Sequence, residues 1–393
     1  MESTDTLKRR VTLASMKSRE RAETLLAGAG ITIDGNNSWD PQILNEGLFD
    51  RVFAGGTLAL GESYMDGWWD VEDLSEFIFR LFRARSLISL LSGVGVVFQI
   101  ARSKILNLQS SSRAFEVGKK HYDIGNDLYE KMLGPHLIYS CGYWKDAHTL
   151  AEAQEAKLDL ICRKIGLKNG DTVLDIGCGW GGFAQFAAEK YGAKVVGITI
   201  SKEQAEVARK RTAGLPVEIR LQDWRDLGNE SFSHIVSVGM FEHVGPKNYR
   251  EFMRKVSTIL SDDGLFLLHT IGHSKVSRSL ERWFNTYIFP NGHLPSITHI
   301  SRATDRRNLF DKPILTMEDW HSFGADYDKT LTAWYTNFEN AWPELKGKYG
   351  ERFHRMWKYY LLVSAGMFRA RYIHLWQIVY SKKGVVGGYT SVR

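Results

Sequence analysis

Short apolar runs alternate with amphipathic stretches along the carboxyl-terminal part of the chain. The apolar runs have the length and the β-branched content of buried strands, and in chain order they read "TVLDIG", "KVVGITI", "VEIRLQDW", "HIVSVGM" and "LFLLHTIG". Between them, stretches such as "GFAQFAAEKYG" and "KEQAEVARKR" have helical spacing. This alternation predicts an α/β fold with a doubly wound, mostly parallel sheet that helices cover on both faces. Near the carboxyl end, "HLWQIVYSK" is predicted to add a closing strand.

The amino-terminal part has a different pattern. Up to about Ala114 it shows helical spacing broken by glycine-rich turns, and no chemical motif stands by itself. We therefore expect a smaller, mostly helical domain over residues 1–114 and the larger domain over 115–393. The larger domain begins with a predicted helix, "HYDIGNDLYEKML", a short extended piece, "LIYSCGYW", and a strongly amphipathic helix, "TLAEAQEAKLDLICRKIGL".

The composition is that of a globular protein with a large stock of aromatic residues. Of 393 residues, 44% are hydrophobic and 24% are charged, which is ordinary for this class. The 12 Trp, 16 Tyr and 20 Phe residues suit a pocket for a long apolar substrate or for a cationic centre, although packing is the commoner use of any one of them. The net charge of +6 favours an anionic partner such as a phospholipid surface, and no basic run is dense enough for a nucleic-acid tail.

Cysteine content and the amino terminus favour a cytoplasmic location. The three cysteines, Cys141, Cys162 and Cys178, form no disulfide framework, and the first 20 residues lack the apolar stretch of a signal peptide. The apolar segment Ser86–Ile100 is shorter than the roughly 20 residues that a membrane-spanning helix needs. Because cations flank it on both sides, it fits either a helix on an anionic membrane surface or a buried helix with solvated ends.

The first predicted strand ends in a glycine-rich loop, "VLDIGCGWGG" (Val173–Gly182), which indicates a cofactor site. Glycines let the backbone approach a ligand closely, and the next helix offers free N–H groups. A nicotinamide dinucleotide would require G-x-G-x-x-G spacing and an acidic residue about 20 positions on, which this stretch does not show. S-adenosylmethionine (AdoMet) is therefore favoured, with Gly177 and Gly179 along its methionine part and Asp223 and Trp224 near its adenine. No metal site is predicted.

Longer motifs resemble the cyclopropane-fatty-acyl-phospholipid synthase family over nearly the whole chain. They read "LGESYMDGWW", "VGKKHYDIGNDLY", "YSCGYWKDA", "VLDIGCGWGG", "VSVGMFEHVGPKNY", "LLHTIG", "YIFPNGHLPS", "EDWHSFGADYDKTL" and "FRARYIHLWQ". The resemblance implies a class I AdoMet methyltransferase fold and an enzyme that transfers a methylene unit from AdoMet to a cis double bond in an acyl chain of a membrane phospholipid. It also implies a homodimer that works transiently at the inner face of the membrane.

The resemblance further implies the residues of the site. The implied AdoMet contacts are Tyr139, Ser140, Gly177, Gly179, Thr199, Ser201, Gln204, Asp223 and Trp224. The family also carries a bicarbonate ion, which would be held here by Cys141, Glu242, His269, Tyr327 and the backbone N–H of Ile271. Ser364 departs from the family pattern, since some relatives have a cysteine at this position. We expect that thiol to be dispensable, because methyl transfer to an alkene needs no covalent enzyme intermediate.

The implied reaction explains why such residues would gather. Attack of an alkene on the sulfonium methyl leaves a carbocation, and ring closure then needs a small base held in a dry pocket. His269 and Tyr327 could donate hydrogen bonds to bicarbonate, while Glu242 accepts from it and takes up its proton. Taken singly, His269 could be a structural residue at a strand end, Glu242 a helix cap and Cys141 a small buried hydrophobe.

Other functions fit parts of the pattern. An AdoMet-dependent methyltransferase could give a methyl-branched or hydroxylated lipid or methylate a small amine, and a membrane-binding protein could keep the fold without the chemistry. Glu242 and His269 favour proton removal, and hence ring closure. Four aromatic residues could wall an acyl tunnel and face the cation, although packing is the more common role for any one of them: Trp283, Phe284, Tyr287 and Phe289.

Overall fold

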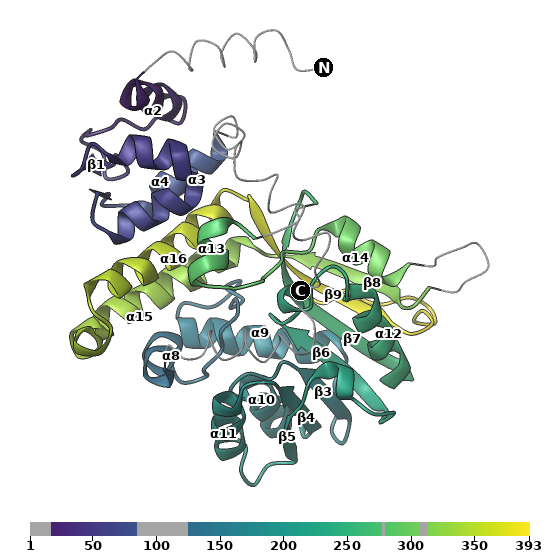
Figure 1. The fold of residues 1–393 in the computed structure, drawn as a ribbon. Helices are drawn as coiled ribbons and strands as arrows, with labels where there is room; N and C mark the ends of the chain where they lie inside the picture. Colours follow the sequence, from purple (N-terminus) through teal and green to yellow (C-terminus); the bar gives the residue numbers. More distant parts are fainter. Residues whose placement is uncertain (1–16, 85–124, 277–279, 306–312) are drawn as a thin grey trace, which may run out of the picture.

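The computed structural model describes residues 17–84, 125–276, 280–305 and 313–393 (Figure 1). The apolar segment Ser86–Ile100 lies outside these ranges, as does the predicted boundary between the two domains near residue 114. The two-domain division therefore stays a prediction. Within the described ranges, no helix is both long and apolar enough to cross a membrane.

A seven-stranded sheet forms the centre of the larger part, in the order β5-β4-β3-β6-β7-β9-β8. The five strands predicted from the alternating pattern run parallel, and β9 pairs antiparallel with both β7 and β8. The strands are β3 (Thr172–Ile176), β4 (Lys194–Thr199), β5 (Val217–Leu221), β6 (Phe232–Val238), β7 (Leu260–His273), β8 (Thr316–Ser322) and β9 (Ile373–Ser381). The predicted α/β fold and its closing strand are confirmed. Strand β8 was missed, because "TMEDWHS" is a polar edge strand without a regular apolar alternation.

Helices cover both faces of this sheet (Figure 1). On one face, Leu174 and Ile235 from neighbouring strands pack against α12 (Tyr249–Ile259) and α14 (Ile297–Thr304). On the other face, Val173 and Val236 pack against α9 (Leu150–Lys164) and α10 (Gly182–Tyr191). Successive side chains of a strand point to opposite faces, so burial on both sides accounts for the nearly continuous apolar runs of the sequence.

The flanking elements agree in part with the sequence prediction. Helix α9 begins with a capping box, in which Thr149 and Glu152 satisfy each other's backbone N–H groups. Helix α8 (Asn126–Leu133) confirms part of the predicted helix that precedes it, and α11 (Lys202–Arg211) follows β4. The segment "LIYSCGYW" forms no strand, and Leu137 within it has a positive φ of 49°.

The amino-terminal residues are mostly helical, as predicted. They form α2 (Ser18–Ala27), α3 (Leu48–Met65) and α4 (Leu74–Arg83), together with the unpredicted short pair β1 (Gln42–Ile43) and β2 (Trp69–Asp70). Helices α3 and α4 lie against α16 (Glu351–Arg369), and α3 also lies against α13 (Arg282–Tyr287) (Figure 1). Helix α16 in turn packs along α15 (Ala325–Tyr349). One hydrophobic core therefore joins residues from both ends of the chain.

Helices α4 and α16 approach each other most closely at Gly366. A Cβ atom at this position would lie 2.5 Å from the backbone oxygen of Ser75 and 2.8 Å from Cβ of Ile78. Such distances are too short for carbon, so the helices can pack in this way only around a glycine.

We expect Gly366→Ala to destabilise the chain by about 1–3 kcal/mol, because the added methyl group must push α4 away from α16. The matched control is Gly347→Ala in α15, where the methyl group meets no atom within 4 Å. This control should be neutral or stabilising by up to about 1 kcal/mol, since alanine is the better helix former. Urea denaturation of both variants measures the difference, and equal stabilities would show that α4 and α16 are not tightly docked.

Candidate active site

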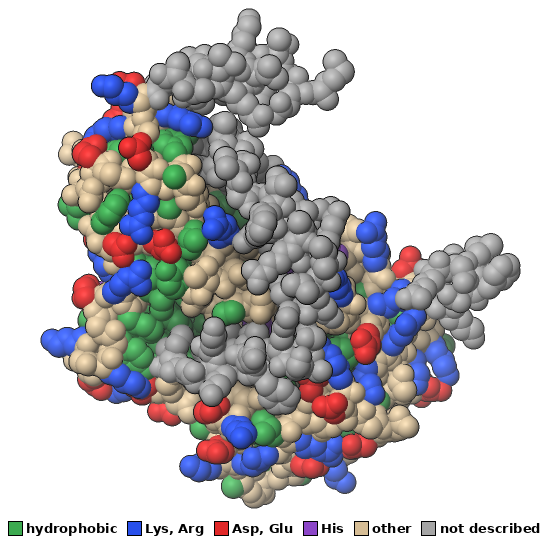
Figure 2. All heavy atoms as spheres, viewed as in Figure 1, with side chains coloured by type: hydrophobic (Ala, Val, Ile, Leu, Met, Phe, Trp, Pro, Cys, Tyr) green, Lys and Arg blue, Asp and Glu red, His purple; other side chains and the backbone are tan. Residues whose placement is uncertain are grey.

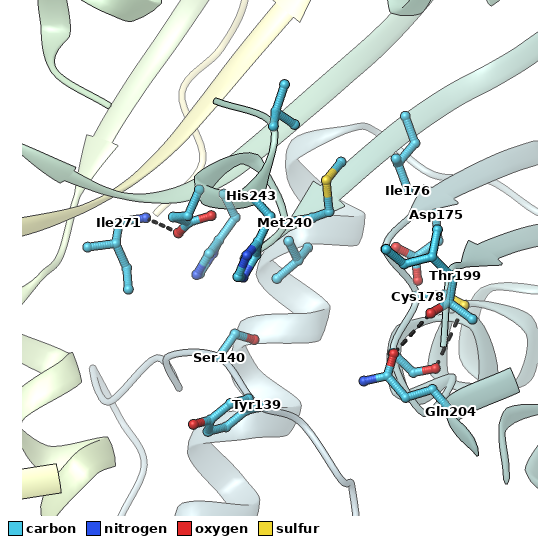
Figure 3. Close-up of a pocket in the computed structure, with 18 of the residues that line it drawn as sticks. Tyr139, Ser140, Asp175, Ile176, Cys178, Thr199, Gln204, Met240, His243 and Ile271 are labelled. Carbon is cyan, nitrogen blue, oxygen red and sulfur yellow. Dashed lines mark hydrogen bonds between the residues drawn. The ribbon is translucent and has the colours of Figure 1, made fainter. Parts of the chain in front are cut away.

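A cavity of about 290 Å³ lies at the carboxyl ends of the parallel strands. It opens beside β3, where the strand order reverses, which is the position at which open α/β sheets bind ligands. Its wall brings together twelve of the predicted site residues: Tyr139, Ser140, Gly177, Gly179, Thr199, Gln204, Asp223, Trp224, Glu242, His269, Ile271 and Tyr327 (Figure 3).

The glycine-rich loop follows β3 and needs its glycines for two reasons. Gly177 and Gly179 have φ angles of 87° and 54°, in the region that L side chains rarely adopt. A Cβ on Gly177 would also lie 2.8 Å from the side chain of Met240. The loop therefore keeps the backbone close to the cavity and leads into α10, as expected for a cofactor loop.

At the end of β4, three predicted AdoMet contacts divide into two roles. The Thr199 hydroxyl donates to Oε1 of Gln204 at 2.9 Å, and both side chains line the cavity (Figure 3). The carboxamide NH₂ of Gln204 is thereby oriented while its oxygen is occupied. Ser201 instead caps α11, where its hydroxyl accepts from the backbone N–H of Gln204, and it is not part of the cavity wall. Its predicted direct contact with AdoMet is not supported by this placement.

Asp223 and Trp224 lie at the end of β5, as predicted. The Asp223 carboxylate is 2.9 Å from the guanidinium of Arg225, and the Trp224 ring packs edge-on against Phe252 with 5.3 Å between ring centroids. Both residues line the cavity, so a role beside the adenine stays a prediction.

Glu242 and His269 present polar atoms that lack hydrogen-bond partners in the described part of the chain. These atoms are Oε2 of Glu242 and Nε2 of His269, and both are buried. The other ring nitrogen of His269 lies 3.3 Å from the carboxamide nitrogen of Gln377, which donates to it. A neutral His269 then carries its proton on Nε2 and is a donor there. Buried polar atoms normally have partners, so this pair fits a small bound group.

The protonation of this pair is set by burial. Burial raises the pKa of Glu242 to about 7, against a hydrogen bond from the backbone N–H of Ile271 that lowers it. Burial, together with the ammonium groups of Lys157 and Lys164, holds the pKa of His269 well below its usual range. His269 is therefore neutral at physiological pH, and Glu242 is close to half protonated, which suits proton exchange.

Two of the groups predicted to hold the bicarbonate ion, the backbone N–H of Ile271 and the thiol of Cys141, have other contacts in the structure. The backbone N–H of Ile271 donates to Oε1 of Glu242 at 2.6 Å, so it is engaged by the carboxylate (Figure 3). Cys141 is fully buried outside the cavity wall, with Sγ 3.1 Å from the Gly142 carbonyl oxygen. Burial raises the pKa of Cys141 well above its usual range, so it is a neutral thiol in a packed interior. The expected contact of Cys141 with an anion is not supported by this placement and stays a prediction.

The four aromatic residues considered for an acyl tunnel divide between the cavity and the packing of α13. Phe289 lines the cavity, but Trp283, Phe284 and Tyr287 do not. The indole N–H of Trp283 lies 3.3 Å from Sδ of Met65, and the hydroxyl of Tyr287 donates to Glu62 at 3.0 Å. These side chains dock α13 onto α3. Ser364 is buried in α16, away from the cavity wall, as a dispensable position should be.

Sequence reasoning missed two groups in the wall. Lys157 projects from α9 and donates to the Ser140 hydroxyl at 3.0 Å, and the hydroxyl of Tyr360 lies 2.8 Å from that of Tyr139. Lys157 had a visible signal, because it is a charged residue on the apolar face of an amphipathic helix. Tyr360 had none, since α16 is more than 200 residues away from Tyr139 in the sequence.

The sheet, its glycine-rich loop and the cavity define a class I AdoMet-dependent methyltransferase. Residues 109–378 match the family model "Mycolic acid cyclopropane synthetase", and the chain is 51% identical to cyclopropane-fatty-acyl-phospholipid synthase of Escherichia coli K12 over 372 residues, 95% of either chain. The chain belongs to this cyclopropane synthase family and is an AdoMet-dependent transferase, which confirms the resemblance found in the sequence.

Solved structures agree with this assignment. Mycolic acid cyclopropane synthase CmaA1, complexed with SAH and CTAB, is 34% identical, and the match covers 68% of this chain and 97% of that one with a TM-score of 0.60. Coclaurine N-methyltransferase, bound to N-methylheliamine and SAH, is 26% identical, with 82% and 99% covered and a TM-score of 0.66. The shared fold therefore serves more than one acceptor chemistry.

We expect Glu242→Gln to stabilise the fold at high pH. A carboxyl group whose pKa is higher in the folded than in the unfolded state lowers the free energy of unfolding once the pH exceeds the unfolded pKa. This loss reaches its full size above the folded pKa, which is about 7 for Glu242. The variant should therefore be more stable than the parent by about 2 kcal/mol at pH 8 and should lose most of this advantage at pH 5.

Urea denaturation at both pH values measures this effect. The exposed Glu72→Gln is the control and should change the free energy of unfolding by less than about 0.5 kcal/mol. Loss of stability in Glu242→Gln at both pH values would mean that the carboxylate is a structural partner of Ile271 and carries no burial cost.

Proposed function

We propose that the chain transfers a methylene unit from AdoMet to the cis double bond of an unsaturated acyl chain in a membrane phospholipid, giving a cyclopropane. The observation that carries the proposal is the pair of buried, unpartnered atoms, Oε2 of Glu242 and Nε2 of His269, in the same cavity as the glycine-rich loop. Ring closure needs a site for proton removal inside the cavity, and this pair can hold the small base that removes the proton.

The cavity supplies the surroundings that the reaction requires. The alkene is a weak nucleophile, so it must be held in line with the sulfonium methyl and away from water. Tyr139, Tyr360 and Phe289 provide an aromatic wall, and an aromatic face stabilises a cation that develops on the acyl chain. The hydroxyls of Tyr139 and Tyr360 are bonded to each other, which leaves them less available to capture that cation.

Bicarbonate, when bound, would supply the small base that removes a proton from the newly added methyl group. The residues present fit such an ion. Neutral His269 can donate from Nε2, and Tyr327 lines the same cavity with a hydroxyl whose pKa burial raises well above its usual range, so it too stays a neutral donor. Glu242 can accept the ion's proton through Oε2 while Ile271 holds Oε1. Cys141 and the N–H of Ile271 have no direct part in this arrangement.

We also propose that the chain contacts the membrane surface and forms a homodimer. Contact with the anionic inner face of the membrane is favoured by the net charge of +6, and a homodimer by the resemblance to the family. On the face in Figure 2, acidic and basic side chains are interspersed, so the excess charge is spread over the visible surface.

The first experiment incubates the chain with AdoMet and vesicles of dioleoyl phosphatidylglycerol and phosphatidylethanolamine. Mass spectrometry should find one CH₂ unit added to the acyl chains, and proton NMR should find the upfield ring protons of a cyclopropane. Acyl chains of unchanged mass would refute the proposal. Added mass with a vinyl methyl signal would indicate a methyl-branched product, and added mass with a carbinol signal a hydroxylated one.

A second experiment tests the anion. In buffer freed of carbon dioxide, turnover should fall and added bicarbonate should restore it, since His269 and Glu242 then have an ion to hold. His269→Ala should raise the bicarbonate concentration needed for half-maximal rate by about tenfold or more, as expected for a lost hydrogen bond to a buried ion. Cys141→Ser, outside the cavity wall, should leave that concentration unchanged. A rate that is independent of bicarbonate in the parent would remove the ion from the mechanism.

A further inference from the structure

Gln377 is a buried carboxamide on an otherwise apolar part of the sheet. It lies in β9 and is 0% exposed, and the next residues on the same face, Leu375 and Val379, are buried to the same extent. Burial of an amide is costly unless its polar atoms are hydrogen-bonded. Within the described residues, the carboxamide has one partner, Nδ1 of His269 at 3.3 Å, and its oxygen Oε1 has none. A group that is satisfied so poorly requires an explanation other than packing.

The strand register places Gln377 between two histidines. It is the direct neighbour of His269 on β7 and of His321 on β8, so the three side chains lie in a row on one face of the sheet. Lys164 of α9 extends this row, because its ammonium nitrogen lies 3.1 Å from Nδ1 of His321. Gln377 therefore has the cavity histidine on one side and a histidine with a neighbouring cation on the other.

This row favours one orientation of the carboxamide. Burial, together with the positive charges of Lys164 and Arg393, lowers the pKa of His321 to about 3, so this side of Gln377 has a positive potential. A carboxamide dipole is most stable with its oxygen toward a positive potential and its NH₂ group away from it. The NH₂ group is thus favoured on the side of His269, where the structure has it.

The orientation of the carboxamide fixes the proton of His269. The NH₂ group can only donate, so it requires a lone pair on Nδ1 of the imidazole. The proton of the neutral ring is then confined to Nε2, the buried atom that has no hydrogen-bond partner in the described part of the chain. In the other tautomer Nε2 would present a lone pair, which repels an anion.

We propose that Gln377 is a positioning residue of the active site, whose NH₂ group holds His269 in the tautomer that can donate from Nε2 to bicarbonate. This inference rests on the proposed function, because it takes that ion as the group that His269 binds. Gln377 is not part of the cavity wall, so it acts through His269.

Three elements place further titratable groups around this pair. They are Glu242 from the turn after β6, Lys157 and Lys164 from α9, and His321 from β8. The parent and its variants at position 377 share all of these groups. A comparison of parent and variant at each pH therefore isolates the change at this one position.

The test replaces the carboxamide by a carboxyl group of the same size. In Gln377→Glu, the carboxyl group and Nδ1 of His269 share one proton at low pH, and Nε2 keeps its own. When the pair loses the shared proton at higher pH, the carboxylate accepts from Nδ1–H and Nε2 is left with a lone pair. The bicarbonate concentration needed for half-maximal rate should lie within about threefold of that of the parent at low pH. At high pH it should exceed the parent's by about tenfold or more, because a hydrogen bond to a charged group is lost.

Nitrogen-15 NMR of the histidine-labelled full chain shows the tautomer directly. The signals of His269 are those that are absent from His269→Ala. In the parent, Nδ1 should have the chemical shift of an unprotonated nitrogen and Nε2 that of a protonated one from about pH 6 to about pH 9. In Gln377→Glu, Nε2 should lose its proton as the pH rises, and the bicarbonate concentration needed for half-maximal rate should increase through the same pH range.

Gln154→Glu is the matched control. Gln154 is also 0% exposed, but it donates to the backbone oxygens of Leu133 and Ile138 at 3.1 and 3.3 Å and is not part of the cavity wall. This variant should lose stability, since a buried carboxyl group replaces two donated hydrogen bonds. Its need for bicarbonate should follow the pH dependence of the parent.

Three outcomes would overturn the inference. A protonated Nδ1 in the parent would mean that Gln377 accepts from His269. A need for bicarbonate that rises by the same factor at every pH in Gln377→Glu would mean a structural role, and a need that stays constant while Nε2 loses its proton would remove the donor from the mechanism. A parent rate that is independent of bicarbonate would instead refute the ion of the proposed function. The NMR spectra still decide in that case whether Gln377 sets the tautomer, so the two failures are distinguishable.

Discussion

A hydrogen bond of 2.6 Å joins the backbone N–H of Ile271 to Oε1 of Glu242. It connects the turn after β6 to the end of β7 and holds a buried carboxylate in one orientation, with Oε2 left unpartnered. Much of the chemistry of the site depends on this constraint. If the carboxylate turned away, the pair of unpartnered atoms that it forms with His269 would be lost.

This hydrogen bond belongs to the edge of the sheet, and helices α15 and α16 from the carboxyl-terminal part of the chain complete the site. Tyr327 and Tyr360 come from α15 and α16, and α16 is held against α4 by the close approach at Gly366. Arg369 of α16 forms ion pairs with Glu76 of α4 at 3.2 Å and with Asp328 of α15 at 2.9 Å, so it connects all three helices. The amino-terminal helices therefore support residues of the cavity wall, and damage to their packing should reach the active site through α16.

Burial explains the unusual protonation of the site. Glu242, Asp175, Lys157 and His269 are all at least nine-tenths buried, and in each the neutral form is favoured by desolvation. Such groups lower the stability of the empty protein, and ligands that bring the complementary charges offset that cost. The same burial that makes these groups costly strengthens their interaction with any ligand group of complementary charge.

Position along the chain, more than residue type, decides which of the candidate side chains line the cavity. Glu242 lies in the turn after β6 and His269 near the carboxyl end of β7. Because parallel strands bring their carboxyl ends to one edge of the sheet, their meeting was foreseeable. Cys141 lies one residue beyond Ser140 in an irregular segment, where a change of one position turns a side chain from the cavity into the interior. Trp283 and Tyr287 depend on how α13 meets α3, more than 200 residues away in sequence.

The sequence by itself determined the five parallel strands with the helices between them, the cofactor loop and the family, because apolar periodicity and glycine spacing are local properties of the chain. Only the tertiary structure decided three hydrogen bonds. The backbone N–H of Ile271 donates to Glu242, Lys157 donates to the Ser140 hydroxyl, and the hydroxyls of Tyr360 and Tyr139 are bonded to each other. These contacts join segments that the chain keeps apart, and whether a polar atom is paired or left unpartnered depends on the packing of the whole fold.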